Sequence, residues 1–251
     1  MSRATMAATL FLCLTLTAGC SDSELVTAPS SAPSATESAA IESTSEVSAL
    51  EGLSALQIWR KTKKDAKQAK SVHLTGSFIE DNDRIQIDLK LNDTNRGIGT
   101  ISLNGEKIFV RRLGKVLYFK ANRKFWDSVD PAATNLFGNR WLKTKNQSGD
   151  MAEFFQLVDM DSFISDSLKL SAADRKKLKR GAGTPVAGQE TVALKSAAKA
   201  FGVLYVAANG PTLPLDLVLP ADKRQFMKFR GWNDPVTVTA PKSPIDMDKL
   251  S

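Results

Sequence analysis

The segment that decides the fold reads Arg84-Ile85-Gln86-Ile87-Asp88-Leu89-Lys90-Leu91-Asn92. Apolar and polar side chains alternate along it without a break, and this two-residue period is typical of a strand with one buried face. One face of the strand therefore carries four apolar side chains: Ile85, Ile87, Leu89 and Leu91. We expect this face to be the inner face of a sheet.

Neighbouring segments alternate in the same way and are joined by tight turns. Asn104-Gly105 is a dipeptide typical of the two-residue hairpin turn. Strands joined so tightly must run antiparallel. The sequence predicts five consecutive strands, at Ser71–Glu80, Arg84–Asn92, Gly97–Leu103, Glu106–Leu113 and Lys115–Ala121, with Phe125-Trp126 as a candidate sixth.

Helical patterns lie before and after these strands. An amphipathic helix is predicted from about Ser54 to Ala69, and we expect it to pack on the sheet rather than to insert into a membrane. After an irregular stretch at 130–148, Gly149–Leu170 is helical and too apolar for a lone surface helix. Ser171–Lys179 predicts a short solvated helix.

The strand pattern then resumes. The later strands are predicted at Glu190–Lys195, Phe201–Ala207, Leu213–Leu219, Gln225–Trp232 and Val236–Thr239. A twisted sheet of this size tends to curl. The predicted fold class is α+β, with a curled antiparallel sheet, a half-barrel of about 10–11 strands, and helices packed on its concave face. Its interior is either a cavity or a core filled by side chains.

The N-terminus carries a secretion signal. Arg3 precedes an apolar run at 6–16 that is too short to span a bilayer. Leu16-Thr17-Ala18-Gly19-Cys20 resembles the bacterial lipoprotein box, in which the cysteine is acylated and becomes the new N-terminus. The alternative is an ordinary signal peptide with an incidental cysteine. Several acyl chains on one residue give lasting attachment, so we expect a protein anchored on the extracytoplasmic face of the cell membrane.

The lipoprotein box divides the sequence into three predicted regions. Residues 1–19 are predicted to be the lipoprotein signal peptide, and 20–50 to be the acylated Cys20 with a flexible linker rich in Ser, Ala, Thr and Glu. Residues 51–251 form the folded domain.

Composition excludes several chemistries. The chain of 251 residues has two Cys and one His. Cys13 leaves with the signal and acylation consumes Cys20, so the mature chain has no thiol nucleophile, disulfide or cysteine metal site. His73 alone cannot build a multi-histidine site, and we expect it to be a hydrogen-bonded strand residue. No phosphate loop, nucleophile elbow or zinc helix motif occurs. We predict no enzymatic activity, no cofactor and no metal.

The charge is unevenly distributed. Residues 21–59 carry six acids and no Lys or Arg, whereas the rest of the body carries 33 Lys and Arg against 21 Asp and Glu, a net charge of +12. Arg111-Arg112 and the run Arg175–Arg180 are candidates for contacts with anionic head groups, and a solvated basic surface is the alternative. No nucleic-acid partner is predicted.

Several short fragments, in this order and spacing, resemble the actinobacterial lipoproteins of the LppX/LprG type and, more distantly, the LolA/LolB carriers. They include Lys70-Ser71-Val72-His73, Val116-Leu117-Tyr118-Phe119-Lys120, Gly138-Asn139-Arg140-Trp141-Leu142, Pro185-Val186-Ala187-Gly188-Gln189 and Pro235-Val236-Thr237-Val238-Thr239-Ala240-Pro241. The resemblance implies a half-barrel with helices on its concave face. It also implies non-covalent binding and transfer of acylated lipids or lipoglycans.

The predicted lipid cavity combines the inner face of the second strand with neighbouring apolar residues. Its expected lining is Ile85, Ile87, Leu89, Leu91, Tyr118, Phe154, Phe155, Leu204 and Val206. The expected partners are an acylated lipid or lipoglycan, the membrane through Cys20, and a membrane transporter. The alternative is a structural or sensory envelope lipoprotein with a filled core, acting through a protein partner. Large aromatics such as Tyr118, Trp126 and Trp141 could stack on sugar rings, but core packing is the favoured role.

Overall fold

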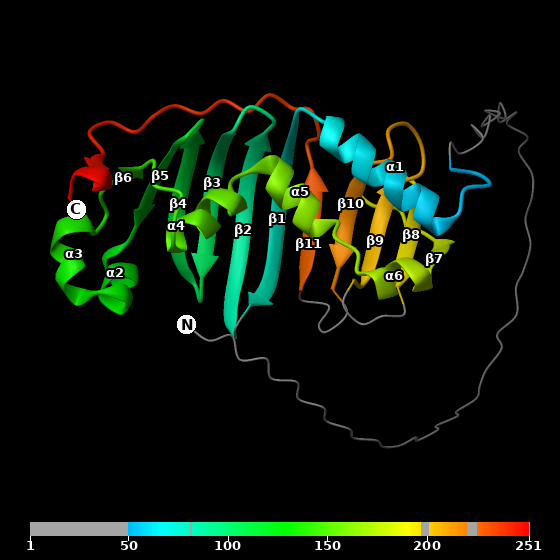
Figure 1. Ribbon diagram of the computed structural model, residues 1–251, viewed down its shortest axis with the longest axis horizontal. Coiled ribbons are helices and arrows are strands. Elements are labelled where there is room, and N and C mark those ends of the chain that lie inside the picture. The colour runs from blue at the N-terminus through cyan, green and yellow to red at the C-terminus, as the bar shows by residue number, and fades with distance from the viewer. Residues whose placement is uncertain (1–49, 81, 197–200, 220–224, 251) are drawn as a thin grey trace, which may run out of the picture. The chain divides into compact units, whose positions relative to one another are not determined.

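The computed structural model describes residues 50–80, 82–196, 201–219 and 225–250 (Figure 1). The predicted signal peptide, Cys20 and the linker through residue 49 lie outside the described residues. Leu50 is fully buried, and Arg180 Nη1 donates a hydrogen bond of 2.8 Å to its carbonyl oxygen.

Strands make up most of the described chain. The first group is β1 (Ser71–Glu80), β2 (Asp83–Asn92), β3 (Arg96–Leu103), β4 (Glu106–Leu113), β5 (Val116–Ala121) and β6 (Leu142–Thr144). The second group is β7 (Leu178–Ala182), β8 (Thr191–Ser196), β9 (Val203–Ala207), β10 (Pro214–Val218), β11 (Phe226–Arg230) and β12 (Ile245–Asp246).

All twelve strands belong to one sheet, in the order β12-β6-β5-β4-β3-β2-β1-β11-β10-β9-β8-β7. The outermost strands, β12 and β7, do not pair with each other, so the sheet is open. The predicted class is confirmed: the fold is α+β, with a curled sheet and helices on its inner face. The sheet has more strands than the expected 10–11, and β12 pairs with β6 in parallel, so the sheet is mixed.

Strand β1 joins the two halves of the chain. It pairs antiparallel with β2 on one side and with β11 on the other. Leu74 lies opposite both Leu89 and Phe229, and all three side chains are fully buried. The early and late strands therefore share one continuous core.

Seven helices complete the described fold. They are α1 (Ala55–Gln68), α2 (Arg123–Val129), α3 (Pro131–Phe137), α4 (Asp150–Leu157), α5 (Met160–Ser167), α6 (Ala172–Lys177) and the 3₁₀ helix η1 (Met247–Lys249).

Helix α1 begins and packs as its sequence predicts. Ser54 and Gln57 form a reciprocal capping box, which satisfies two backbone N–H groups of the first turn. The buried stripe includes Ile58, Trp59 and Ala66, at helical spacing. Trp59 Nε1 donates to Leu168 O at 3.2 Å, which ties α1 to the end of α5.

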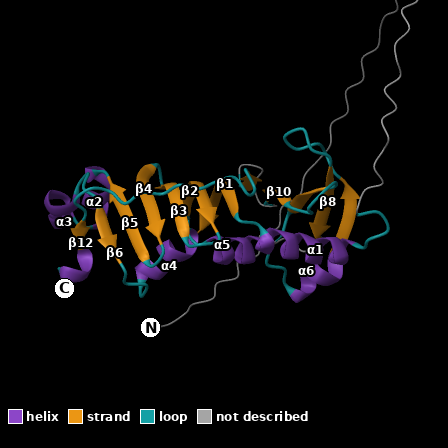
Figure 2. Ribbon diagram, turned by 90° about the horizontal axis from the view of Figure 1, so that it is seen from above, coloured by secondary structure: helices purple, strands orange, loops and turns teal. Residues whose placement is uncertain are grey.

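One face of the sheet carries four of the helices. Figure 2 shows α1, α4, α5 and α6 along the same side, with α2 and α3 at the β5–β6 end. On the strands beneath them, alternate residues are buried, as in β4, where Ile108, Val110 and Arg112 point inward. Among the described residues, no helix lies on the opposite face of the central strands (Figures 1 and 2).

Two predicted strands are wrong. Phe125-Trp126 lies in α2, because the Asn122 side chain accepts a hydrogen bond from Phe125 N and caps a helix there. Residues 236–239 form no strand. Pro235 has no N–H to donate to a ladder, and the Thr239 carbonyl accepts its hydrogen bond from Arg111 Nη1 at 2.9 Å.

The middle of the chain is more regular than expected. The stretch at 130–148 contains α3 and β6, and the helical region Gly149–Leu170 is divided into α4 and α5. The predicted short helix is α6, which leads straight into β7. Trp126 is buried in an aromatic cluster with Phe119, Phe125 and Phe137, so it serves as core.

Candidate functional site

The inner face of β2 lies under the helices. Leu89 and Leu91 are fully buried and Ile87 is 4% exposed, whereas Ile85 is only half-buried. Burial therefore decreases along the strand toward the β1–β2 turn. The packed core gives way to open space at that end.

This open space is a cavity of about 850 Å³ between the sheet and helices α4 and α5. Small-molecule sites commonly occupy about 300–1,000 Å³. Its apolar wall comes from eight elements and from residues just beyond strand ends. The wall residues are Phe78, Ile79, Ile85, Ile101, Leu103, Ile108, Phe154, Leu157, Phe163, Phe201, Leu217, Leu219, Phe226 and Met227.

The floor of the cavity is built by strand register. Ile85 on β2 lies opposite Phe78 on β1 and opposite Leu103 on β3. Side chains directly opposite one another in adjacent strands project from the same face. These three residues therefore form one continuous apolar row across the sheet.

Helices α4 and α5 form the roof of the cavity, and contacts with β5 and β3 position α4 and the turn that follows it. Phe154 of α4 stacks on Phe119 of β5, with ring centroids 6.4 Å apart. Gly97 on β3 faces the turn after α4, and a Cβ there would make an ordinary van der Waals contact of 3.5 Å with the carbonyl oxygen of Val158. A Cβ at Gly97 would also lie 2.7 Å from Leu91 Cδ2. The chain thus crosses the sheet closely where β3 has no side chain.

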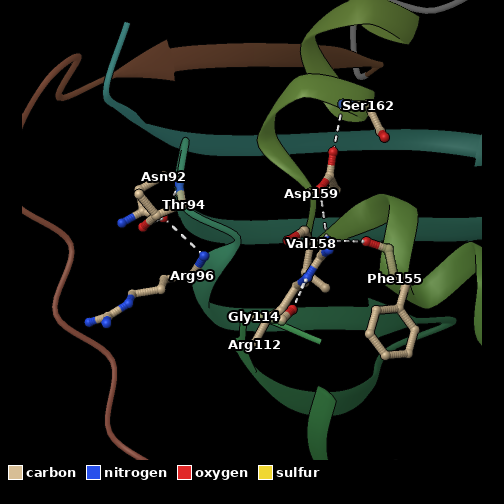
Figure 3. Close-up of polar contacts among 9 residues, drawn as sticks. All are labelled: Asn92, Thr94, Arg96, Arg112, Gly114, Phe155, Val158, Asp159 and Ser162. Atoms are coloured by element: carbon tan, nitrogen blue, oxygen red, sulfur yellow. Dashed lines mark hydrogen bonds and ion pairs between the residues drawn. The ribbon is translucent and has the colours of Figure 1, made fainter. Parts of the chain in front are cut away.

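Buried Arg112 holds the junction between α4 and α5 (Figure 3). Its Nη1 donates to the carbonyl oxygens of Phe155 and Val158, at 3.0 and 3.3 Å, and lies 2.9 Å from Asp159 Oδ2. Asp159 Oδ1 in turn accepts from Ser162 N at 2.9 Å and caps α5. The expectation that Arg112 meets anionic head groups is therefore wrong: strand alternation points Arg111 outward and Arg112 into the core.

The mouth of the cavity is polar. Its side chains carry three acids and one base, together with amide and hydroxyl groups. They are Asp83, Glu153, Gln156, Asp166, Ser167, Lys169 and Gln225. Glu153, Gln156, Asp166 and Lys169 are exposed, so the cavity opens to solvent along α4 and α5. A molecule held there would have apolar contacts inside and polar contacts at the mouth.

Two of the nine residues predicted to line a cavity border this one: Ile85 and Phe154. Six more are buried in the same hydrophobic core and do not reach the cavity surface. These are Ile87, Leu89, Leu91, Phe155, Leu204 and Val206. Tyr118 lies on the other face of the sheet, because its neighbours Leu117 and Phe119 occupy the inward positions of β5.

Most of the apolar residues that line the cavity were not predicted from the sequence. Phe78 and Leu103 could have been found from the register, because the β1–β2 turn at Asn82 and the β2–β3 turn at 93–95 fix which residues face Ile85. Leu219 and Phe226 come from the distant β10–β11 region, and no local pattern connects them with β2.

His73 and the acids of α5 do not lie together in one site. His73 Nε2 lies 2.7 Å from Asp88 Oδ1, on the sheet face away from the cavity. Asp161 pairs with Lys67 at 3.2 Å, while Asp166 lies at the cavity mouth. In the described ranges, no group of three or more His, Cys, Asp and Glu residues could hold a metal ion. Nor does any described helix combine the length and apolarity needed to cross a membrane.

Comparison with known proteins finds a solved structure with this fold but no similar sequence. No family model matches the sequence, and no curated protein is significantly similar to it. Among solved structures, LprF from Mycobacterium bovis is 14% identical with a TM-score of 0.50, and the match covers 74% of this chain and 96% of LprF. The Pseudomonas aeruginosa MucA/MucB complex matches at 14% identity with a TM-score of 0.31, covering 78% of this chain and 60% of that one. The chain has the fold of LprF, which confirms the predicted resemblance to LppX/LprG-type lipoproteins at the level of the fold.

Proposed function

We propose that this protein is a membrane-anchored, extracytoplasmic lipoprotein that binds the acyl chains of a lipid or lipoglycan in its cavity and passes the molecule on. The cavity of about 850 Å³, walled by apolar side chains and opening at a polar mouth, is the observation that carries this proposal. The fold of LprF supports it as an analogy of architecture.

Binding in this proposal needs no chemical step. Each methylene withdrawn from water contributes about 0.8 kcal/mol, so a chain seated against Ile85, Leu103 and Phe154 is held by its apolar area. The polar end of the ligand remains at the mouth, beside groups such as Gln156 and Ser167. Release requires the ligand to leave past α4 and α5, toward a membrane or a transporter partner.

The localisation in this proposal comes from the lipoprotein box. Acylation of Cys20 would attach the chain to the membrane, and the linker would hold the folded body beside it. Cleavage before Cys20 leaves the body on the extracytoplasmic side.

A second candidate is a structural or sensory lipoprotein that acts through a protein partner. Complete burial of Leu89, Leu91, Leu204 and Val206 favours it, because most of the inner face is filled by the protein's own side chains. This candidate predicts that no lipid occupies the cavity.

The decisive experiment is extraction of the purified protein. The chain from Cys20 to Ser251 with Cys20→Ser carries no acyl group of its own, so any lipid recovered is non-covalently bound. We expect mass spectrometry of the organic extract to show a discrete lipid in near-stoichiometric amount. An extract no richer in lipid than that of an unrelated secreted protein, prepared in the same way, would favour the second candidate.

A further inference from the structure

A dense group of cations lies at the β7 end of the sheet. We call it the basic end surface and define it by four exposed side chains of α1 and α6: Arg60, Lys64, Lys176 and Lys177. Within the described part of the chain, none of these four is held in an ion pair. Their charges are therefore available to an external partner.

The acids of helices α1 and α6 are already engaged. Asp65 of α1 pairs with Lys61 at 2.8 Å. Asp174 of α6 is 2% exposed and accepts hydrogen bonds from the hydroxyls of Ser171 and Ser196. Glu51 is exposed and lies four residues before Ala55, the first residue of α1. The surface therefore keeps a strong positive charge.

The elements that carry these cations lie together. Helix α6 leads directly into β7, and α1 packs against β7. Figures 1 and 2 both show α1 and α6 on the same side of the sheet, with α1 starting at the β7–β8 end and running across the strands toward β10. The contact of Arg180 with the Leu50 carbonyl fixes the start of the described body to β7. The basic end surface is thus located where the linker joins the body.

We propose that the basic end surface docks on an anionic phospholipid bilayer, the membrane in which Cys20 is anchored. The proposal rests on the anchoring part of the proposed function. Clusters of four to eight Lys and Arg next to a membrane anchor are attracted to anionic lipids. The predicted linker has 29 residues between Cys20 and Leu50, and a flexible chain of that length spans roughly 30 Å, so the anchor would keep this surface close to the head groups.

The other charged face is less suited to this role. On the helix-free face of the central strands part of the charge is neutralised, because Arg230 pairs with Asp216 at 2.6 Å and Asp88 lies 2.7 Å from His73 Nε2. Docking through the β7 end also leaves the cavity mouth free, because Asp83, Glu153 and Asp166 belong to the mouth and not to the basic end surface. Those acids would be repelled by the same anionic membrane.

The test compares two variants of equal net charge. Both are made in the Cys20–Ser251 chain with Cys20→Ser, so that no acyl chain contributes to binding. The first carries Arg60→Gln, Lys64→Gln, Lys176→Gln and Lys177→Gln, the four cations of the basic end surface. The control carries four exposed lysines changed elsewhere: Lys90→Gln, Lys107→Gln, Lys115→Gln and Lys242→Gln. Binding is measured by sedimentation with vesicles of phosphatidylcholine alone and with vesicles that also contain phosphatidylglycerol.

We expect the parent chain to bind the phosphatidylglycerol vesicles and not the neutral ones, with affinity falling as salt rises. Each lysine or arginine near an anionic surface strengthens binding about fivefold, so the loss of all four should lower the affinity of the first variant about 600-fold. The control should stay within about twofold. Equal losses in both variants, or parent binding that does not distinguish the two vesicle types, would overturn the proposal. Lipid extraction of the same variants tests the cavity separately, since failure there leaves the vesicle result standing.

Discussion

Arg112 Nη1 and Asp159 Oδ2 lie 2.9 Å apart, and this contact fixes helices α4 and α5 to the inner face of the sheet (Figure 3). The same nitrogen also reaches the carbonyl oxygens of Phe155 and Val158, and Arg112 Nε donates to Gly114 O at 3.0 Å. The carbonyls that α4 leaves unpaired at its end are thus satisfied by a residue of β4. The roof of the cavity depends on one buried guanidinium.

Arg112→Met should destabilise the fold strongly. The substitution leaves the Asp159 carboxylate and two helix-end carbonyls without their donor, and breaking a buried pair in this way costs about 3–5 kcal/mol. Thermal unfolding should shift down by roughly 6–20 °C for a domain of this size. The matched control is Arg96→Met, an exposed arginine on β3, which should change stability by less than about 0.5 kcal/mol. Equal melting temperatures for the two variants would contradict the role of Arg112.

Acid should weaken the attachment of the C-terminal segment. Thr144 Oγ1 donates to Asp248 Oδ1 at 2.6 Å and Lys145 N donates to Oδ2 at 2.9 Å, and these bonds lower the pKa of Asp248. A carboxylate with a depressed folded-state pKa contributes stability above its unfolded pKa of about 3.9, and the contribution is lost as pH falls through the folded value.

Asp248→Asn tests this dependence. The wild type should be more stable than the variant at neutral pH, and the gap should narrow below about pH 4. Urea unfolding at a series of pH values measures it. A gap that stays constant down to the pH of acid unfolding would show that charge on Asp248 does not contribute.

The sequence predicts the elements whose signals are local. The alternation in β2 predicts burial of Ile87, Leu89 and Leu91, and the structure buries all three. The Asn104-Gly105 turn predicts the β3–β4 hairpin, and both residues adopt the positive φ angles that such turns require. Ser54 marks the start of α1 for an equally local reason.

The cavity could not be predicted in the same way. Its wall joins Phe78 and Ile85 to Leu219 and Phe226, which are more than a hundred residues away along the chain. Its roof exists because the helical region breaks at Val158, and that break depends on a contact with Arg112 from another element. Periodicity identifies which face of a strand is buried, but it cannot identify where along that face the packing stops.

Acylation of Cys20 is the prediction on which the localisation depends. Cys20→Ala removes the thiol that the lipoprotein box presents, so the variant should lose acyl mass and move from the membrane fraction to soluble or uncleaved forms. Fractionation followed by mass spectrometry of the N-terminal peptide measures both effects. The lipoprotein assignment would fail if the variant sediments with membranes like the wild type and the wild-type Cys20 carries no acyl mass.

Two tryptophan substitutions on β2 separate an open cavity from a filled core. Ile85 lines the cavity and Leu89 is fully buried on the same face, four residues away. In Ile85→Trp the added ring has room to enter the cavity, so stability should change little while bound lipid falls. In Leu89→Trp the ring has no space, and overpacking should cost about 1–3 kcal/mol.

Melting temperature and extracted lipid are measured together on both variants. The open cavity predicts opposite profiles: loss of lipid at constant stability for Ile85→Trp, and loss of stability for Leu89→Trp. If Ile85→Trp instead unfolds as readily as Leu89→Trp, the space beside Ile85 is not available to a ligand. Together with a lipid-free wild type, that result would refute the carrier function and favour a protein that acts through its surface.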